Sequence, residues 1–390
     1  MAPINPFKHW ISIYPPGADS GAVSQPDSAI SMSCYESMAQ LPSSCEALLD
    51  AASRDSYDLS GDWFRLLENK ALPPERRLRI YVTEQHGKVR SILPFMLIKA
   101  KWYSQMSSLT NYYSSLYRPL LADTVTSAEL AGALRIIVAD SAIDRLRFDA
   151  MDIEHPTFEM LQSAIRQIGL RPYEFSCFGN WYLPVQNRPF QAYFQSLPSQ
   201  VRNTVRRREK KFYAGGKGKL EIVSGADGLE KAITAWGKIY SASWKNAEPF
   251  PEFVPGLIRM CAAHNWLRLG IAYYDDEPVA AQIWIVNHGR AAIYKLAYDE
   301  KFAHLSAGTV LTTHLMRHAL DEDKIHEADY LIGDDAYKKD WMSHRRERRG
   351  IIAYNTRRIG GIAGAAIQMC GGIVRQARIW LSTRNRPVQE

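Results

Sequence analysis

The sequence LRLGIAYYDDEPVAAQIWIVNHG (residues 267–289) contains two apolar runs separated by a short acidic segment. The runs occupy residues 267–274 and 278–289 and are rich in Ile, Val, Leu and aromatic side chains. Apolar runs of this length on either side of a polar turn are typical of two antiparallel strands. The stretch therefore predicts a β-hairpin.

A second stretch, LRIYVTEQ (78–85) followed by KVRSILPFMLIKAK (88–101), has the same design, with a His-Gly turn between its runs. Leu78 lies 189 positions before Leu267, and the second strands align after a one-residue slip at the turn. Self-similarity at a fixed separation is the mark of an internal repeat. We interpret the two hairpins as copies of one structural unit.

The repeat continues on both sides of the hairpins. A helical pattern precedes each hairpin, and a helix, a strand, a further helix and a further strand follow it, as in SAELAGALRIIVADS with RLRFDAMD and in AGTVLTTHLMRHALDED with ADYLIGDD. The closing helix and strand are expected in PTFEMLQSAIRQIGLRPYEFS and in KKDWMSHRRERRGIIAYN. This order predicts an α/β fold, with mixed central sheets flanked by helices in each half.

Four segments follow from this pattern. Residues 51–185 and 186–358 form the two halves, residues 1–50 are rich in Ser, Pro and Ala and are expected to be a loosely ordered arm, and residues 359–390 form a Gly-rich, basic tail. With 46% hydrophobic residues, the chain can bury its own cores. Its five cysteines are scattered without ligand spacing, so neither a disulfide framework nor a metal site is expected.

The start of the sequence lacks the apolar run of a secretory signal, which favours a cytoplasmic protein. The longest uncharged apolar stretch, IGGIAGAAIQMCGGIV (359–374), is too short to span a bilayer comfortably. Two interpretations of it remain open. It is a tail helix that packs on the protein or is loosely ordered, or it is a membrane-surface helix flanked by arginines, which would make the protein membrane-associated.

The net charge of +7 is concentrated in two places. Residues 199–219 carry eight basic and one acidic side chains, and residues 336–390 carry twelve and three. Basic segments of this kind attract phosphate on a nucleic acid, a lipid or a cofactor. The helix expected at 202–211 has basic residues around most of its surface, which favours a solvated face bridging the halves and leaves contact with phosphate as the alternative.

Two places in the second half carry residues suited to chemistry. The strand expected at 291–302 is followed by a helix that starts at Ser306 or Gly308, and a helix N-terminus with small residues can cradle a pyrophosphate or simply begin a helix. The first half has no glycine at the matching place. At the end of the next strand, GDDAYKKDW (333–341) gathers carboxylates, a phenol and lysines, where either aspartate could also be a helix cap.

These elements resemble the GNAT acyltransferase superfamily, and more closely its FemAB-like and cellulose-biosynthesis CelD-like branch, whose members contain two GNAT-like halves. The likeness rests on LPSQVRNTVRRREKKF (197–212), DDEPVAAQIWIV (275–286), YKLAYDEKFAHLSAGTVLTTHLM (294–316) and DYLIGDDAYKKDWM (329–342). It covers residues 186–356, and the first half matches as a degenerate repeat. It implies a tandem GNAT-like (acyl-CoA N-acyltransferase) fold in which only the second half is catalytic.

The resemblance also implies an acyl-CoA co-substrate, no metal, and a set of site residues. The pantetheine would lie beside Leu296 and Tyr298, where a strand amide polarises the thioester, and the pyrophosphate would lie on the backbone of Ser306, Ala307, Gly308, Thr309 and Val310. The loop departs from the usual Q/R-x-x-G-x-G/A pattern, with His304, Ala307 and Thr309 at its motif positions. Tyr337 would be the general acid, and Asp334 or Asp335 would either accept the amine proton or hold a cationic acceptor. Trp244, Lys295 and Lys338 would bind the acceptor substrate, and Trp244 has core packing as its alternative.

Three functions are compatible with these features. The first is transfer of an acyl group, with acetyl expected, from acyl-CoA to a small amine such as an amino sugar or amino acid, in cell-surface polysaccharide biosynthesis. The second is FemAB-type peptidyl transfer from aminoacyl-tRNA, although nucleic acid is not the expected partner. The third is a non-catalytic partner at a membrane surface or in a complex.

Overall fold

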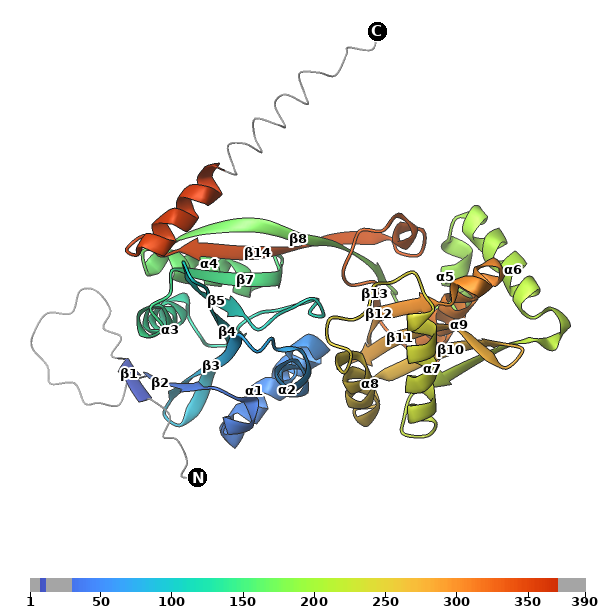
Figure 1. Cartoon of the computed structure of the whole chain (residues 1–390), viewed down its shortest axis with the longest axis horizontal. Helices are drawn as coiled ribbons and strands as arrows, with labels where there is room; N and C mark the ends of the chain where they lie inside the picture. The colour runs from blue at the N-terminus through green and yellow to red at the C-terminus, as the bar shows by residue number, and fades with distance from the viewer. Residues whose placement is uncertain (1–7, 12–29, 371–390) are drawn as a thin grey trace, which may run out of the picture.

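The computed structural model describes residues 8–11 and 30–370, and within these residues fourteen strands form one mixed sheet (Figure 1). The strands of the first half are β1 (Lys8–Ile11), β2 (Ile30–Tyr35), β3 (Arg76–Gln85), β4 (Lys88–Lys99), β5 (Ser104–Ser108), β6 (Leu120–Leu121), β7 (Arg145–Asp152) and β8 (Arg171–Pro184). Those of the second half are β9 (Gly218–Val223), β10 (Leu267–Tyr274), β11 (Glu277–Asn287), β12 (Arg290–Tyr298), β13 (Glu327–Asp329) and β14 (His344–Tyr354).

Helices flank this sheet in both halves, which confirms the predicted α/β class (Figure 1). They are α1 (Glu46–Asp55), α2 (Gly61–Ala71), α3 (Ser127–Asp140), α4 (Pro156–Gln167), α5 (Phe190–Ser196), α6 (Ser199–Phe212), α7 (Leu229–Ser241), α8 (Phe253–Ala263) and α9 (Ala307–Asp321). Local sequence fixes several of their starts. A capping box between Thr126 and Glu129 opens α3, and Pro156 occupies the first turn of α4.

The internal repeat is present in three dimensions. The hairpin β3–β4 corresponds to β10–β11, and both form at the predicted residues. In each half the next strand pairs in parallel with the strand that follows a helix, β5 with β7 and β12 with β13. The sequence analysis did not predict α8, which lies between α7 and the hairpin of the second half, or β9, which precedes α7.

The two halves exchange strands at their junction. β14, the last strand of the second half, lies between β7 and β8 of the first half, and the end of β8 pairs with β13 (Figure 1). The prediction of a closing helix in KKDWMSHRRERRGIIAYN was wrong, since a single 3-10 turn (Ala336–Asp340) precedes the strand. The strand is stabilised by pairing with β7 on one edge and β8 on the other, and these partners lie far away in the sequence.

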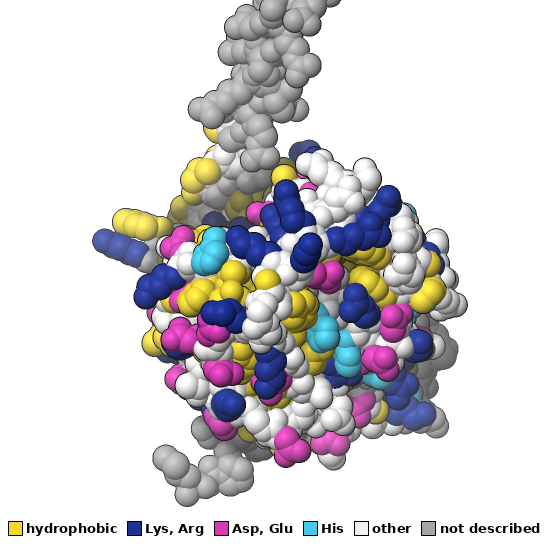
Figure 2. Space-filling model, turned by 90° about the vertical axis from the view of Figure 1, so that its right-hand side faces the viewer, with side chains coloured by type: hydrophobic (Ala, Val, Ile, Leu, Met, Phe, Trp, Pro, Cys, Tyr) yellow, Lys and Arg dark blue, Asp and Glu magenta, His cyan; other side chains and the backbone are white. Residues whose placement is uncertain are grey.

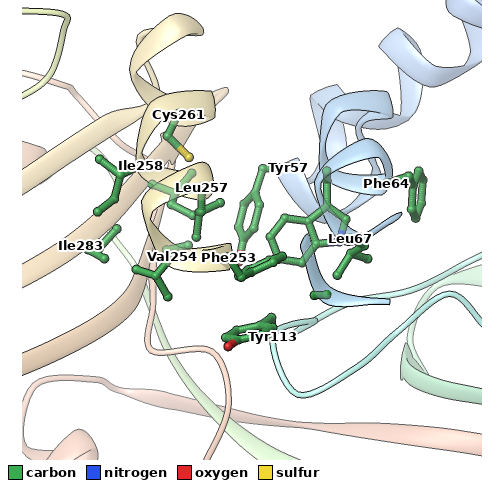
Figure 3. Close-up of a cluster of buried hydrophobic side chains, with 14 of the residues drawn as sticks. Tyr57, Phe64, Leu67, Tyr113, Phe253, Val254, Leu257, Ile258, Cys261 and Ile283 are labelled. Atoms are coloured by element: carbon green, nitrogen blue, oxygen red, sulfur yellow. The ribbon is translucent and has the colours of Figure 1, made fainter. Parts of the chain in front are cut away.

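A hydrophobic core joins the halves. Tyr57 and the helix α2 residues Phe64 and Leu67 belong to the same buried cluster as Phe253 and Leu257 of α8 (Figure 3). Tyr113, from the loop after β5, stacks on the Phe253 ring with 4.0 Å between the centroids. The shared core fixes the loop of the first half against the second half.

The described residues near the two ends of the chain form regular structure. The expectation of a loose segment does not hold for residues 30–50, because β2 pairs with β3 and α1 begins at Glu46. Residues 359–370 form a helix that starts with close packing of Gly361 against the Asn355 carbonyl and extends away from the sheet (Figure 1). Residues 371–374 of the apolar stretch lie outside the described residues. No helix in the described part of the chain is long and apolar enough to cross a bilayer.

Candidate active site

The candidate site lies where two parallel strands of the second half separate. β12 pairs with β13 only from Arg290 to Ala292, and residues 293–298 have no strand on that edge within the described residues. A cavity of about 210 Å³ opens here. Its lining comes from both halves and comprises Tyr112, Tyr113, Ser115, Lys245, Ile293, Tyr294, Lys295, Leu296, Tyr330, Leu331, Ile332, Asp335, Tyr337 and Lys338.

A β-bulge marks the same place on β12. The register with β11 shifts between Ile283 and Trp284, so that Ile283 faces Lys295, Trp284 faces Ile293, and Tyr294 is the extra residue. A bulge bends its strand and re-aims the side chains next to it. The bulge thus contributes to the separation of β12 from β13 and leaves backbone groups beside the cavity.

Three residues of the predicted GDDAYKKDW cluster line this cavity, namely Asp335, Tyr337 and Lys338. Burial, together with the charge of Asp335, raises the pKa of Tyr337 to about 12. The Lys338 side chain is enclosed, and its Nζ donates to the carbonyl oxygens of Ile332 at 2.6 Å and Gly333 at 3.2 Å. Burial lowers its pKa, and the Asp335 carboxylate lies 3.3 Å from its Nζ.

The fourth predicted residue of the cluster, Asp334, is not part of the lining. Its carboxylate accepts hydrogen bonds from Arg345 at 2.7 Å and from Trp181 Nε1 at 2.6 Å. The bond with Arg345 lowers the pKa of Asp334 below its ordinary value. Two donors hold this carboxylate, so of the two predicted carboxylates only Asp335 lies at the cavity.

Lys295, predicted to bind the acceptor, belongs to a buried ion pair. Its Nζ donates to Glu248 Oε1 at 2.7 Å, and the Tyr113 hydroxyl donates to Glu248 Oε2 at 2.8 Å. Burial acts to raise the pKa of Glu248, but the hydrogen bond from Lys295 and its other donors outweigh burial and hold the pKa below its ordinary value. The network links β12, the loop after α7 and the loop of the first half.

The predicted phosphate cradle is a helix N-terminus next to the open edge of β12. α9 begins at Ala307, and Ser306 before it has left-handed backbone geometry with φ 53°. The amides of Thr309 and Val310 donate to the Ser306 carbonyl, whereas those of Ala307 and Gly308 have no partner among the described residues. A Cβ added at Gly308 would meet only Tyr298, at 4.0 Å. Free amides and open space suit an anion at this helix start.

The basic helix α6 lies beside this cradle. Arg208 donates to Thr309 Oγ1 at 2.6 Å, and the Lys211 ammonium donates to the His304 carbonyl at 2.9 Å. The helix packs on α9 through buried Val205 and Phe212, so the expectation that it bridges the halves was wrong. Figure 2 shows Lys and Arg side chains gathered on the upper part of this end of the molecule, where α6 lies in Figure 1.

The remaining predicted residues lie near the same edge. Leu296 lines the cavity and Tyr298 follows it on β12. Trp244 is 48% exposed and packs on the Tyr298 ring with 4.5 Å between the centroids, outside the cavity lining. Exposure at this level argues against the core-packing alternative for Trp244.

Sequence reasoning missed the wall that the first half supplies. Tyr112 and Tyr113 lie over Lys295, with its Nζ 5.0 and 5.3 Å from their ring centroids. Lys245 and Glu248, from the loop between α7 and α8, were missed as well. The sequence shows two adjacent tyrosines in NYYSS (111–115) and a Lys and a Glu in WKNAE (244–248). Nothing in their spacing predicts that they lie at β12.

Comparison with known proteins gives this arrangement a family context. Residues 199–339 match the family model described as an acetyltransferase (GNAT) domain. The second half carries a GNAT-type acyltransferase domain. The match includes the cradle, the bulged strand and the GDDAYKK cluster, and the two halves of the chain repeat one α/β arrangement. None of the curated protein sequences compared with the chain matches it.

Solved structures share the architecture at low sequence identity. The crystal structure of FemX is similar over 78% of this chain and 94% of its own, with 11% identity and a TM-score of 0.56. A tandem GNAT protein from the clavulanic acid biosynthesis pathway covers 83% of this chain and 98% of its own, with 12% identity and a TM-score of 0.49. At such identities the likeness concerns the fold. No group of three or more His, Cys, Asp or Glu suited to a metal occurs among the described residues.

Proposed function

We propose that the protein is an acyl-CoA-dependent N-acyltransferase, with acetyl-CoA as the expected donor and a small amine, such as an amino sugar or amino acid, as the acceptor. The observation that carries the proposal is the open edge of β12, within the residues that match a GNAT domain. The cavity with the Tyr337 phenol lies along this edge, and the free N-terminus of α9 lies next to Tyr298 at its end. The resemblance to the CelD-like branch makes cell-surface polysaccharide biosynthesis the proposed setting.

The residues at the cradle fit a pyrophosphate. The amides of Ala307 and Gly308 supply donors, and Arg208 and Lys211 supply positive charge at the same helix start. The usual glycine-rich loop is absent from this chain, and cations from α6 compensate for it electrostatically. When bound, acyl-CoA supplies an activated thioester.

The residues around the cavity then handle protons and charge. A backbone amide near Leu296 polarises the thioester carbonyl, and the Tyr337 phenol protonates the departing thiolate. A phenol whose pKa lies near 12 retains its proton at neutral pH, which suits an acid. Asp335 lies at the cavity and serves to hold a cationic acceptor.

The test combines binding with turnover. Calorimetry with acetyl-CoA and longer acyl-CoAs should show binding, and thiol release from acetyl-CoA should accelerate with glucosamine or free amino acids as acceptors. Absence of acyl-CoA binding would contradict the proposal. Displacement of bound acetyl-CoA by charged tRNA at lower concentration would instead favour the alternative, aminoacyl-tRNA-dependent transfer, for which α6 is the candidate contact.

Membrane association remains a second proposal for the tail. Ile359, Ile362, Ile367 and Met369 are exposed on the helix at 359–370. Flotation with liposomes, compared between the full chain and a chain ending at residue 358, would test it.

A further inference from the structure

Three lysines line the cavity, and two of them are neutralised. Lys295 pairs with Glu248 at 2.7 Å, and Lys338 has backbone carbonyls and Asp335 around its ammonium. Lys245 differs, because its side chain makes no ion pair or hydrogen bond with any described residue. A largely buried amine that makes no direct ion pair and lies beside other cations favours the neutral, proton-accepting form.

We propose that Lys245 is the general base of the reaction and takes the proton from the ammonium group of the acceptor. The inference rests on the proposed function and assigns to this chain's own lysine a step that the sequence had assigned to Asp334 or Asp335. The position of Lys245 in the cavity that also contains Tyr337 carries the argument.

The groups facing Lys245 shift its pKa in opposite directions. Burial, and next the positive charge of Lys295, lower the pKa of Lys245 to about 8, and Lys338 acts in the same sense. Glu248 and Asp335 favour the charged form and are outweighed. The other titratable side chains of the lining are tyrosines 112, 113, 294, 330 and 337, whose raised pKa values keep them neutral near pH 8. A base with a pKa near the working pH has a useful neutral fraction and still binds a proton well.

The carboxylates near the cavity are poor competitors for this step. Asp334 is held by Arg345 and Trp181, and Glu248 accepts hydrogen bonds from Lys295 and Tyr113. Asp335 is paired with Lys338 and its side chain is 61% exposed. Lys245 is therefore the lining group best placed to gain a proton.

The loop that carries Lys245 is fixed from several sides. The Tyr240 hydroxyl donates to the Asn246 carbonyl at 3.0 Å, and the Glu300 amide donates to the Ala242 carbonyl at 3.3 Å. The Tyr113 hydroxyl reaches the Phe250 carbonyl at 3.4 Å. Contacts with α7, with the turn after β12 and with the first half restrict where the lysine can point.

The proton balance closes with groups present in the cavity. Neutral Lys245 takes one proton from the acceptor ammonium, and the freed lone pair forms the N–C bond as the C–S bond breaks. Tyr337 donates its proton to the thiolate and regains one from the new amide nitrogen. Lys245 returns its proton to solvent, so each turnover releases one proton, one thiol and one amide.

Competitive labelling tests the ionisation without an acceptor. The full chain is treated with trace acetic anhydride between pH 6 and 11, and peptide mass spectrometry gives the labelling rate of each lysine. We expect Lys245 to show a midpoint near pH 8, and exposed Lys231, labelled in the same experiment, is the internal control. A labelling midpoint of Lys245 close to that of Lys231 would contradict the assignment of Lys245 as the general base.

Two variants distinguish a Lys245 that accepts a proton from a Lys245 that acts only as a permanent positive charge. Lys245→Arg keeps the charge but cannot lose its proton, and Lys245→Met keeps the length alone. With acetyl-CoA and glucosamine, both should lose about 100-fold in kcat with little change in KM, and the rise of kcat with pH should disappear. Retention of kcat in Lys245→Arg, or a rise in KM that arginine restores, would contradict the inference.

The outcome for acyl-CoA binding keeps the two proposals distinct. If the unmodified chain does not bind acetyl-CoA in calorimetry, both the proposed function and the role of Lys245 are contradicted. If it binds acetyl-CoA but Lys245 is labelled with the same midpoint as Lys231, only the role of Lys245 is contradicted.

Discussion

At the scale of single residues, the phenol of Tyr337 lies in the cavity with its pKa raised by burial. An acid that protonates a leaving thiolate acts in the chemical step and contributes little to donor binding. We expect Tyr337→Phe to lower kcat by about 10²-fold or more, with the Kd for acetyl-CoA changed less than threefold. Thiol-release kinetics and calorimetry measure the two quantities.

A matched control is available in the same cavity. Tyr112→Phe also removes one hydroxyl from the lining, from a side chain that lies over Lys295. Equal losses in the two variants would contradict a special role for Tyr337.

A second residue, Asp58, gives a prediction about pH. Asp58 is 1% exposed in a polar cavity between the halves, and burial raises its pKa to about 7, although Ser115 donates to its carboxylate at 2.6 Å. The folded protein therefore holds a proton that the unfolded chain releases above about pH 4. The contribution of Asp58 to the free energy of unfolding is therefore fully present below about pH 4, and it is lost as the pH rises towards 7.

Asp58→Asn removes the titration but keeps an acceptor for Ser115. We expect the variant to be more stable than the parent at pH 8, by up to about 4 kcal/mol, and similar to it at pH 4. Urea unfolding at both pH values measures the difference. If variant and parent differed in unfolding free energy by the same amount at both pH values, Asp58 would not be the titrating group.

At the scale of elements, α6 is expected to anchor the donor through its phosphates. Arg208 touches Thr309 at the start of α9, whereas Arg207 on the same helix is exposed. We expect Arg208→Ala to weaken acetyl-CoA binding about tenfold at low salt, with a smaller effect at high salt, because charge contacts are screened. Calorimetry at two salt concentrations measures this.

Arg207→Ala is the control for α6, since it removes the same charge one position away. Equal weakening by both variants would mean that α6 acts through its overall field and that Arg208 has no particular contact with the cradle.

The exchanged strand β14 gives a stability prediction. A Cβ at Gly350 would lie 2.6 Å from the Phe148 carbonyl oxygen and 2.1 Å from Phe175 Cζ, so the backbone of β7 and the side chain from β8 leave no room. We expect Gly350→Ala to lower the free energy of unfolding by about 2 kcal/mol or more. Chemical denaturation measures the change.

Gly237 provides the contrast within a helix. A Cβ there meets nothing within 4 Å, and alanine is the better helix former, so Gly237→Ala should be neutral or stabilising. Equal destabilisation by both changes would exclude crowding at β14 as the cause.

Local patterns were sufficient for some elements and insufficient for others. The hairpins and α9 follow from apolar periodicity, as the buried Val310, Leu311 and Leu315 of α9 illustrate. The closing strand β14 could not be placed, because its partners β7 and β8 lie far away in the sequence. Tertiary packing decides which strands pair, and the alternation of apolar and polar residues along a strand does not reveal its partners.

The same distinction holds within the site. Tyr337, Asp335 and Lys338 were found because they follow one strand end. Lys245, Tyr112 and Tyr113 were not, because they reach the cavity from loops whose paths depend on the shared core. Asp334 and Asp335 are adjacent in sequence, yet only one lines the cavity, and only the geometry of the chain distinguishes them.

At the scale of the whole molecule, the halves are parts of one folded body. Their cores share Tyr57, Phe64, Phe253 and other residues (Figure 3). In addition, β14 of the second half lies between two strands of the first half (Figure 1). We expect residues 186–358 alone to be unstable or insoluble, although they include the GNAT match. Expression with circular dichroism and acetyl-CoA calorimetry checks this.

Co-expression supplies the corresponding control. Residues 1–185 and 186–390 produced as separate chains should assemble and regain acetyl-CoA binding, because the interface is the same core. A second half that folds and binds acetyl-CoA by itself would show that the first half is dispensable.

The position of β14 also constrains how the chain is made. During synthesis β7 and β8 emerge long before residue 354, so the gap between them stays open while the whole second half is translated. Unpaired strand edges invite association with other chains. The nascent protein should therefore depend on protection by chaperones until its last strand is inserted, and its yield should be sensitive to translation speed across residues 186–354.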